Sequence, residues 1–308
     1  MKILITPRSY GKEDKEVFSI LKNSGIDIIL NETGGILDTD TIKRMIAPCD
    51  GVILGVDPMS ADVIAAAPNL KAISRYGVGT DNIDMNEAAR RGIKVSRTAG
   101  ANSDAVADYA MALMLAVGRR TVLIDEKCRH GSWQKITTQD LSQKTLGIFG
   151  LGAIGRKVAQ RARGFDMEIL AYDVFWDNNY AREHYIKRAE PDEIFEQADY
   201  ITLHLPLIPE TRGFIGRSEI EKMKTNAVLI NTARGGLIQE DVLLEALKNG
   251  RIYGAGIDVF EEEPPKNPEW LTLPNVVLGS HCAASTPGAT IMMGKMATEN
   301  LLKDLGLK

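Results

Sequence analysis

Short apolar runs alternate with helical patterns along the whole chain, and this alternation limits the possible folds more than any other feature. Before residue 98 the strand-like runs are KILIT, IDIIL, GVILG, LKAIS and GIKVS, and after Leu141 they are TLGIF, MEILAYD, YITLHL, AVLINTA, GAGIDVF and NVVLGS. Runs with so little polar alternation are typical of parallel strands covered by helices on both faces. The sequence therefore predicts an α/β protein with two doubly wound parallel sheets.

Helical patterns occupy the intervals between these runs. Residues 12–25 form a helix candidate closed by Gly25, and residues 60–67 form one opened by Ser60 as N-cap. Residues 102–120 form a long candidate capped by Asn102 or Ser103, between the two strand series. Residues 286–308 form a last helix, which can pack back on the first unit and make the first domain discontinuous.

Composition excludes several classes of function. A chain of 308 residues is long enough for two domains, and its net charge of -4 gives no basic surface for nucleic acid or an anionic membrane. Its three cysteines have no metal-ligand spacing, so neither a metal site nor a disulfide framework is predicted. The N-terminal MKILITPRS is too short for a signal peptide, and the longest apolar run, 109–118, is half a membrane span. These features indicate a soluble, cytoplasmic protein.

A glycine-rich loop, GLGAIG at residues 150–155, lies between the strand TLGIF and an amphipathic helix. In a dinucleotide site Gly150 permits the turn, Gly152 lets the backbone approach a pyrophosphate, and Gly155 lets helix and strand pack closely. The next strand ends at Asp173, 18 residues after Gly155, where a carboxylate can accept hydrogen bonds from a ribose diol and repel a 2′-phosphate. Because no arginine follows Asp173 directly, NAD is favoured over NADP. A tight turn with no ligand is the alternative.

Polar residues follow the later strands at the edge where α/β sheets bind ligands. Packing alone explains such a series poorly, because each buried polar group would need its own partner. Arg234 suits bidentate capture of a carboxylate, although a surface ion pair is the simpler alternative. At most one of Glu261, Glu262 and Glu263 need face inward. The residues delivered at these strand ends are His204 and Pro206, then Thr232, Ala233 and Arg234, then Asp258, and finally His281, for which a core histidine is the alternative.

These motifs resemble those of the D-isomer-specific 2-hydroxyacid dehydrogenases, and most closely the short phosphoglycerate dehydrogenase-like members. The resemblance covers nearly the whole chain and rests on RYGVGTDNID at 75–84, GLGAIG, HLPL, NTARGG, GIDVFEEEP and GSHCAAST. It implies a flavodoxin-like substrate domain of residues 1–98 and 285–308, into which a Rossmann NAD-binding domain of residues 99–284 is inserted. It also implies a homodimer built through the NAD-binding domain.

The resemblance assigns roles residue by residue. The catalytic residues would be Arg234, which orients the substrate carboxylate, His281, which exchanges the proton, and Glu263, which holds the His281 ring. The cofactor contacts would be Val78, Gly150, Gly152, Ala153, Ile154, Gly155, Asp173, His204, Pro206, Thr211, Thr232, Ala233, Arg234, Asp258, His281 and Ala283. The substrate contacts would be Arg75, Tyr76, Gly77, Val78, Gly79, Asn102, Arg234 and His281.

The substrate is less clearly indicated. The first expectation is 3-phosphoglycerate and its oxo acid 3-phosphohydroxypyruvate, which belong to serine biosynthesis. Phosphate-handling members tend to carry an arginine where this chain has Gly55, so glyoxylate or hydroxypyruvate reduction is the alternative, and Arg75 and Lys135 remain candidates for a distal phosphate. Since the chain stops at Lys308, we expect no feedback by serine through a C-terminal regulatory domain. A more distant alternative is an NAD-sensing corepressor-like binding module.

One cysteine lies beside the expected proton donor. Cys282 directly follows His281, and a small buried hydrophobe is its simplest interpretation. Sensitivity of the activity to oxidation at Cys282 is the alternative.

Overall fold

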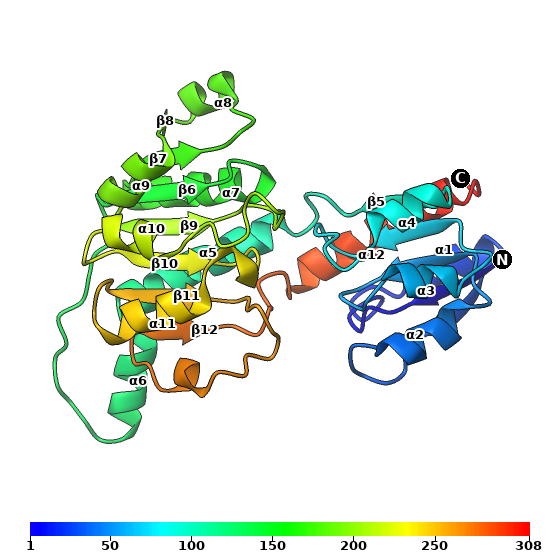
Figure 1. Ribbon diagram of the computed structural model, residues 1–308, viewed down its shortest axis with the longest axis horizontal. Helices are drawn as coiled ribbons and strands as arrows, with labels where there is room; N and C mark the ends of the chain where they lie inside the picture. Colours follow the sequence, from blue (N-terminus) through cyan, green and yellow to red (C-terminus); the bar gives the residue numbers. More distant parts are fainter. The chain divides into compact units, whose positions relative to one another are not determined.

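The computed structural model describes residues 1–308 and contains two compact α/β units (Figure 1). The first unit consists of Met1–Asn102 and Ser285–Lys308, and the second of Ser103–Ala284. The chain therefore passes into the second unit at the start of the long helix and returns after the last strand. None of the helices combines the length and the apolar character that a membrane crossing requires.

The first unit is a five-stranded parallel sheet with the order β2-β1-β3-β4-β5, the flavodoxin-like order. Its strands are short apolar runs, as the sequence predicts: β1 (Lys2–Ile5), β2 (Asp27–Leu30), β3 (Gly51–Leu54), β4 (Ala72–Arg75) and β5 (Lys94–Arg97). Its helices are α1 (Glu16–Asn23), α2 (Thr39–Ile46), α3 (Ala61–Ala65), α4 (Met85–Arg90) and α12 (Pro287–Asp304).

Helices cover both faces of this sheet. One face is a core in which Leu4, Val52 and Ile73 of the strands meet buried residues of α2 and α3. On the other face α12 packs against β3, β4 and β5 and against α1. The Ser74 hydroxyl donates to the Ala297 carbonyl at 2.8 Å, which ties β4 to α12. The C-terminal helix is therefore an integral part of the first unit.

The second unit is a seven-stranded parallel sheet with the order β12-β11-β10-β9-β6-β7-β8, the Rossmann order extended by one strand. Its strands are β6 (Thr145–Phe149), β7 (Glu168–Tyr172), β8 (Ile186–Arg188), β9 (Tyr200–Leu203), β10 (Val228–Asn231), β11 (Gly254–Ile257) and β12 (Val276–Leu278). Its α-helices are α5 (Ser103–Gly118), α6 (Thr121–Arg129), α7 (Ala153–Ala162), α8 (Asn178–Glu183), α9 (Pro191–Gln197), α10 (Arg217–Lys222) and α11 (Glu240–Lys248), and its 3₁₀ turns are η1 (Arg163–Phe165), η2 (Gly235–Leu237) and η3 (Pro268–Leu271).

Alternate residues of the strands build two separate cores in the second unit. In β10, Val228 and Ile230 face a core that contains α5 and α7, whereas Leu229 faces a core that contains α9, α10 and α11. Successive side chains of a strand point to opposite faces, so a run of apolar residues serves both layers. Figure 1 shows α10 and α11 in front of this sheet and α5 behind it. This sandwich fixes the strand ends that carry the candidate site.

Three local predictions need correction. The sequence predicts six strands after Leu141, but the structure has a seventh, β8, in which only Ile186 is buried. Ser60 lies at the N-cap position of α3, yet its side chain makes no capping hydrogen bond. The α5 helix begins at Ser103, and the buried Asn102 Oδ1 accepts no hydrogen bond, so Asn102 does not cap it.

Candidate active site

The loop of residues 150–155 turns at the point where the strand order reverses, because β6 pairs with both β7 and β9. Gly150 has a φ of +94°, and a Cβ there would lie 2.6 Å from the His204 carbonyl oxygen. A Cβ at Gly155 would lie 2.0 Å from the Gly150 carbonyl oxygen. A Cβ at Gly152 would meet nothing within 4 Å. Side chains would therefore clash with the protein at Gly150 and Gly155, whereas the backbone at Gly152 borders free space. Ala153 and Ile154 begin α7 directly after it. This is the form of a phosphate-binding loop at a helix N-terminus.

Asp173 follows β7 and braces this loop. Its Oδ2 accepts from the Leu151 backbone N–H at 2.6 Å, and its Oδ1 accepts from the Phe175 N–H at 2.8 Å. Two carboxylate oxygens offer about four acceptor positions. The side chain therefore keeps acceptor capacity for a ribose diol beside the loop.

The end of β9 presents a neutral histidine. Burial lowers the pKa of His204 to about 3. Its Nε2 lies 3.1 Å from the Thr202 hydroxyl, while its buried Nδ1 has no hydrogen-bond partner. Downstream, the Thr211 hydroxyl donates to the Pro206 carbonyl at 2.6 Å, which folds the HLPL segment back on itself. A buried ring nitrogen without a partner is consistent with a place for a polar ligand group.

The end of β10 is shaped by an asparagine that sequence reasoning did not single out. Asn231 accepts from the Ala233 N–H at 3.0 Å and donates to the Arg234 carbonyl at 2.8 Å. A Cβ at Gly235 would lie 1.9 Å from the Phe260 carbonyl carbon, so this turn abuts the segment after β11. The buried hydroxyl of Thr232 has no hydrogen-bond partner. Asn231 is visible in the sequence as the first letter of NTARGG, but its role as a backbone brace is not.

An acid–imidazole pair links the ends of β11 and β12. His281 Nδ1 lies 2.8 Å from Glu263 Oε2, and the Glu263 Oε1 accepts from the Phe260 N–H at 3.2 Å. Burial raises the pKa of the Glu263 carboxyl, but the hydrogen bond and charge of His281, the Phe260 N–H and the charge of Arg234 bring it below its usual range. With Nδ1 bound to Glu263, Nε2 is the ring nitrogen that can exchange a proton with a substrate.

The turn that carries His281 is held by Asp258, whose side chain is fully buried. The His281 N–H donates to the Asp258 carbonyl at 2.8 Å. The next two backbone N–H groups, of Cys282 and Ala283, donate to the two carboxyl oxygens at 3.0 and 2.9 Å. Asp258 thus contacts three successive residues and fixes the direction in which the His281 ring leaves the backbone.

The RYGVG loop belongs to the first unit, where it follows β4. Arg75 is 7% exposed, and its guanidinium donates to the carbonyls of Gly79 at 2.8 Å, of Leu54 at 3.4 Å and of Tyr76. Gly77 has a φ of +142° and accepts from the Thr98 hydroxyl at 3.2 Å. Val78 and Gly79 are only partly buried. The loop therefore presents backbone groups, with the arginine beneath them, and its contact with a substrate stays a prediction, as does that of Asn102.

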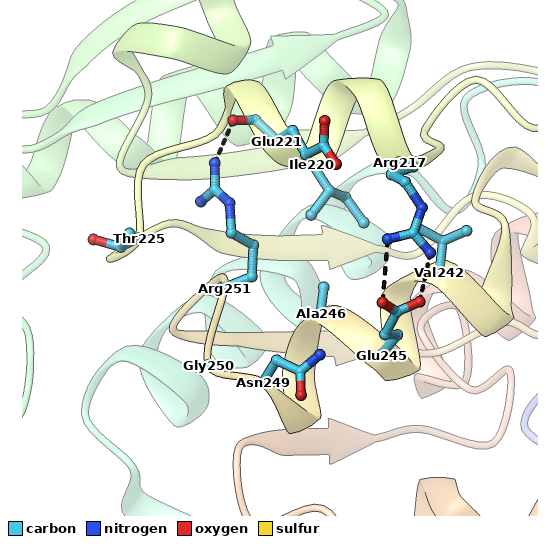
Figure 2. Close-up of a pocket in the computed structure, with 10 residues that line it drawn as sticks. All are labelled: Arg217, Ile220, Glu221, Thr225, Val242, Glu245, Ala246, Asn249, Gly250 and Arg251. Atoms are coloured by element: carbon cyan, nitrogen blue, oxygen red, sulfur yellow. Dashed lines mark hydrogen bonds and ion pairs between the residues drawn. The ribbon is translucent and has the colours of Figure 1, made fainter.

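A separate pocket of about 410 Å³ lies between α10 and α11 (Figure 2). Its Arg217 is already engaged with both carboxyl oxygens of Glu245, and Arg251 donates to the Glu221 carbonyl. Thr225 precedes β10 and Asn249 precedes β11, so this pocket lies at the amino edge of the sheet. It contains none of the predicted site residues.

The second unit therefore gathers most of the predicted set at one edge. Arg234, Glu263 and His281 follow β10, β11 and β12, next to the glycine loop after β6 in a parallel sheet. No group of three or more histidine, cysteine or acidic side chains has the arrangement of a metal site. The edge combines a nucleotide-type loop, an arginine and an acid–imidazole pair, which suits proton exchange beside a bound dinucleotide.

Comparisons with known proteins agree with this geometry. Residues 111–283 match the family model described as D-isomer specific 2-hydroxyacid dehydrogenase, NAD binding domain. The chain is 39% identical over 300 residues to hydroxypyruvate reductase of Thermotoga maritima, covering 96% of both chains. It is 44% identical over 250 residues to D-3-phosphoglycerate dehydrogenase of Methanocaldococcus jannaschii, covering 80% of this chain and 48% of that one. A crystal structure of the TT0316 protein from Thermus thermophilus is similar with a TM-score of 0.91 and 34% identity, over 99% of this chain and 97% of that one.

Proposed function

Because the chain belongs to the D-isomer specific 2-hydroxyacid dehydrogenase family of NAD-dependent oxidoreductases, we propose that it reduces a small unphosphorylated 2-oxo acid, hydroxypyruvate or glyoxylate. The proposed proton transfer is supported by the distance of 2.8 Å between His281 Nδ1 and Glu263 Oε2. The proposed substrate class is supported by the residues around Gly55 in the first unit.

The residues of the second unit fit a dinucleotide. The open backbone at Gly152, the N-terminus of α7 and the Asp173 carboxylate would hold its pyrophosphate and ribose. The neutral His204 adds a buried ring nitrogen in need of a partner. When bound, NADH supplies a hydride for the carbonyl carbon of the substrate.

The protein's own residues would handle charge and proton. The carbonyl oxygen of the substrate gains negative charge in the transition state and must be protonated. His281 would donate that proton from Nε2, because Glu263 holds the ring through Nδ1. Arg234 would bind the substrate carboxylate and polarise the carbonyl. In the oxidation direction His281 would act as the base.

The neighbourhood of Gly55 supports an unphosphorylated substrate. A Cβ at Gly55 would lie 3.0 Å from Asp57 Oδ2 and 3.3 Å from the Thr6 hydroxyl oxygen. Asp57 is 3% exposed and accepts from the Leu37 N–H at 2.8 Å, so it is fixed in place. The position that bears an arginine in phosphate-handling members is thus small and lies beside an acidic group. A phosphate would gain no cation there and would meet a carboxylate.

A second candidate substrate is 3-phosphohydroxypyruvate. It is favoured by the 44% identity to a D-3-phosphoglycerate dehydrogenase. Of the two cations proposed for a distal phosphate, Arg75 is occupied by backbone carbonyls, and only Lys135 is exposed. This makes the phosphorylated acid the weaker candidate.

The direct test is NADH oxidation at 340 nm against hydroxypyruvate, glyoxylate, pyruvate and 3-phosphohydroxypyruvate, with NADPH in parallel. We expect kcat/KM to be at least about 10-fold higher for an unphosphorylated acid, since a phosphate without a cation loses a charge-assisted hydrogen bond of about 1.5–3 kcal/mol. A preference for 3-phosphohydroxypyruvate would reverse the substrate assignment. Absence of turnover with all four acids would favour an NAD-sensing binding module.

We also propose that the protein is a cytoplasmic homodimer joined through the NAD-binding unit. The α6 helix has no buried residue, Val122 on it is 54% exposed, and Trp133 just after it is 88% exposed. Figure 1 shows α6 projecting from the lower end of its unit. Such apolar exposure on a projecting segment is suited to contact with a second copy of this chain.

All three cysteines are free, which fits a reducing compartment. Sedimentation of the double variant Val122→Glu with Trp133→Glu should show a monomer, and an unchanged profile would place the interface elsewhere.

A further inference from the structure

The His281 turn has an unusual backbone conformation. His281 has a φ of +55°, in the left-handed region that non-glycine residues rarely adopt. Such a conformation is strained and persists only where the surroundings impose it. Asp258 supplies part of that constraint through the N–H groups of residues 281 to 283. What holds Asp258 itself therefore bears on the direction of the catalytic ring.

The surroundings of Asp258 Oδ1 leave little free space. A Cβ at Gly279 would lie 2.1 Å from this oxygen and 2.8 Å from the Tyr109 hydroxyl oxygen. The carboxyl group and the tyrosine hydroxyl thus both lie close to the space where a Gly279 side chain would begin. Tyr109 lies in the middle of α5, an otherwise apolar stretch of the helix that packs on β10, β11 and β12. It is absent from every set of site residues expected from the sequence.

The Cys282 sulfur lies between these two groups. Its Sγ is 3.4 Å from the Tyr109 hydroxyl oxygen and 3.6 Å from Asp258 Oδ1. One thiol hydrogen can serve only one acceptor, so when the thiol donates to Asp258 the Tyr109 hydroxyl can donate to the sulfur. Burial, followed by the contact with Cys282, raises the pKa of Tyr109, so the hydroxyl keeps its hydrogen at neutral pH. The result is a polar chain from helix α5 to the turn of His281.

We propose that Tyr109 is a positioning residue for His281, acting through Cys282 and Asp258. The tyrosine hydroxyl and the cysteine sulfur fix the carboxyl group, the carboxyl group fixes three backbone N–H groups, and the turn then aims His281 Nδ1 at Glu263. The catalytic part of this inference rests on the proposed function of His281. The structural part, that Tyr109 controls the ring of His281, does not.

The test begins with Tyr109→Phe, which removes one oxygen and keeps the ring. We expect kcat to fall about 3- to 10-fold, as for the loss of one weak hydrogen bond, while KM for NADH stays unchanged. Cys282→Ala should have a similar effect and Cys282→Ser a smaller one, because serine restores a hydrogen-bonding atom. The double variant should be no worse than the poorer single variant, since both act in one chain of contacts.

Two further readouts separate positioning from a general loss of structure. The acid limb of the pH profile of kcat/KM should move to higher pH in Tyr109→Phe, because Glu263 loses part of the His281 contact that lowers its pKa. Tyr253→Phe is the matched control: its hydroxyl accepts from Arg120 Nε at 3.0 Å, near the end of α5 and away from the turn. This control should leave both kcat and the pH profile unchanged.

A measurement independent of activity completes the test. In ¹⁵N-histidine NMR spectra the His281 signal can be assigned by its absence in His281→Ala, because the chain has only four histidines. In Tyr109→Phe the Nδ1 signal should move toward that of a free imidazole. An unchanged signal together with an unchanged kcat and pH profile would overturn the inference. If the wild-type protein turns over no 2-oxo acid, the proposed function fails, and the NMR signal still decides the role of Tyr109.

Discussion

The carboxyl edges of the two sheets differ in how they use their polar side chains. In the first unit Arg75 and Asp57 are almost fully buried, and their side chains form hydrogen bonds with backbone groups. The arginine donates to loop carbonyls, and the acid accepts from the Leu37 N–H. In the second unit the corresponding edge carries the pair Glu263 and His281, whose side chains are 36% and 40% exposed.

This difference separates two kinds of strand end. A buried charged group that is saturated by backbone partners shapes a loop and cannot take part in proton exchange. A partly exposed acid–imidazole pair keeps one ring nitrogen for a substrate and can change its protonation state. The comparison therefore predicts that changes in the second edge alter catalysis, and that changes in the first edge alter stability.

The largest effect is expected for His281→Ala. General acid–base catalysis contributes about 10²–10⁴-fold, so kcat for the preferred 2-oxo acid should fall by about 10³-fold, with little change in the affinity for NADH. Steady-state rates and a fluorescence titration with NADH measure the two quantities. His130→Ala is the control, because His130 is an exposed histidine at the end of α6 and should leave both unchanged. An unchanged kcat in His281→Ala would contradict the claim that the second edge, unlike the first, acts in catalysis.

The first edge should respond to Arg75→Met by losing stability. This change keeps an apolar stem and removes the donor from the Tyr76 and Gly79 carbonyls, while the Leu54 carbonyl keeps the Tyr76 N–H. Each carbonyl left unsatisfied costs about 1–3 kcal/mol. We expect the free energy of unfolding of the first unit to fall by about 3 kcal/mol, visible by calorimetry as an earlier transition. Arg90→Met in α4 removes a guanidinium that is 72% exposed, and should change it by less than about 0.5 kcal/mol. Equal stabilities of the two variants would show that Arg75 does not support the loop.

A smaller effect on catalysis is expected for Glu263→Gln. Because the pKa of Glu263 is held below its usual range, its contribution to the pair is present at neutral pH and is lost as the pH falls through its folded pKa. The variant should lower kcat about 10- to 100-fold and remove the acid limb of the pH profile. Glu262→Gln, an exposed neighbour paired with Lys266, should keep that limb. Persistence of the acid limb in Glu263→Gln would assign it to another group.

Much of the fold could be predicted because most strands are continuous apolar runs. The predicted strands in both units agree with the observed ones to within three residues at each end. The strand β8 was not predicted because two of its three residues, Lys187 and Arg188, are exposed and charged. Charged residues are common on a strand that, like β8, lies at the edge of its sheet. The capping role expected for Asn102 failed because residue type alone does not show where a side chain points.

Site residues could be predicted from the sequence only where their position directly after a strand indicates that they lie at the carboxyl edge of the sheet. Parallel strands bring their carboxyl ends to one edge, so Arg234 and His281 could be selected from the chain order. Composition could not choose Glu263 among three adjacent glutamates, and only the resemblance did so. Tyr109 gave no signal, because a tyrosine in an apolar helix usually belongs to the core, and its contact with the His281 turn depends on packing between distant segments.

The smallest effect, and the one that tests the comparison most closely, concerns Asp173. Both of its carboxyl oxygens accept backbone N–H groups, whereas in the first unit Asp57 accepts one through Oδ1, yet we expect Asp173 also to bind the ribose diol. Asp173→Asn keeps the shape and removes the charge, so the ratio of kcat/KM for NADH to that for NADPH should fall about 10-fold, since the variant repels a 2′-phosphate less and binds the diol less tightly. Asp192→Asn, on the surface of α9, is the control and should keep the ratio. An unchanged ratio in Asp173→Asn would mean that Asp173 only braces the loop, as Asp258 holds the turn of His281.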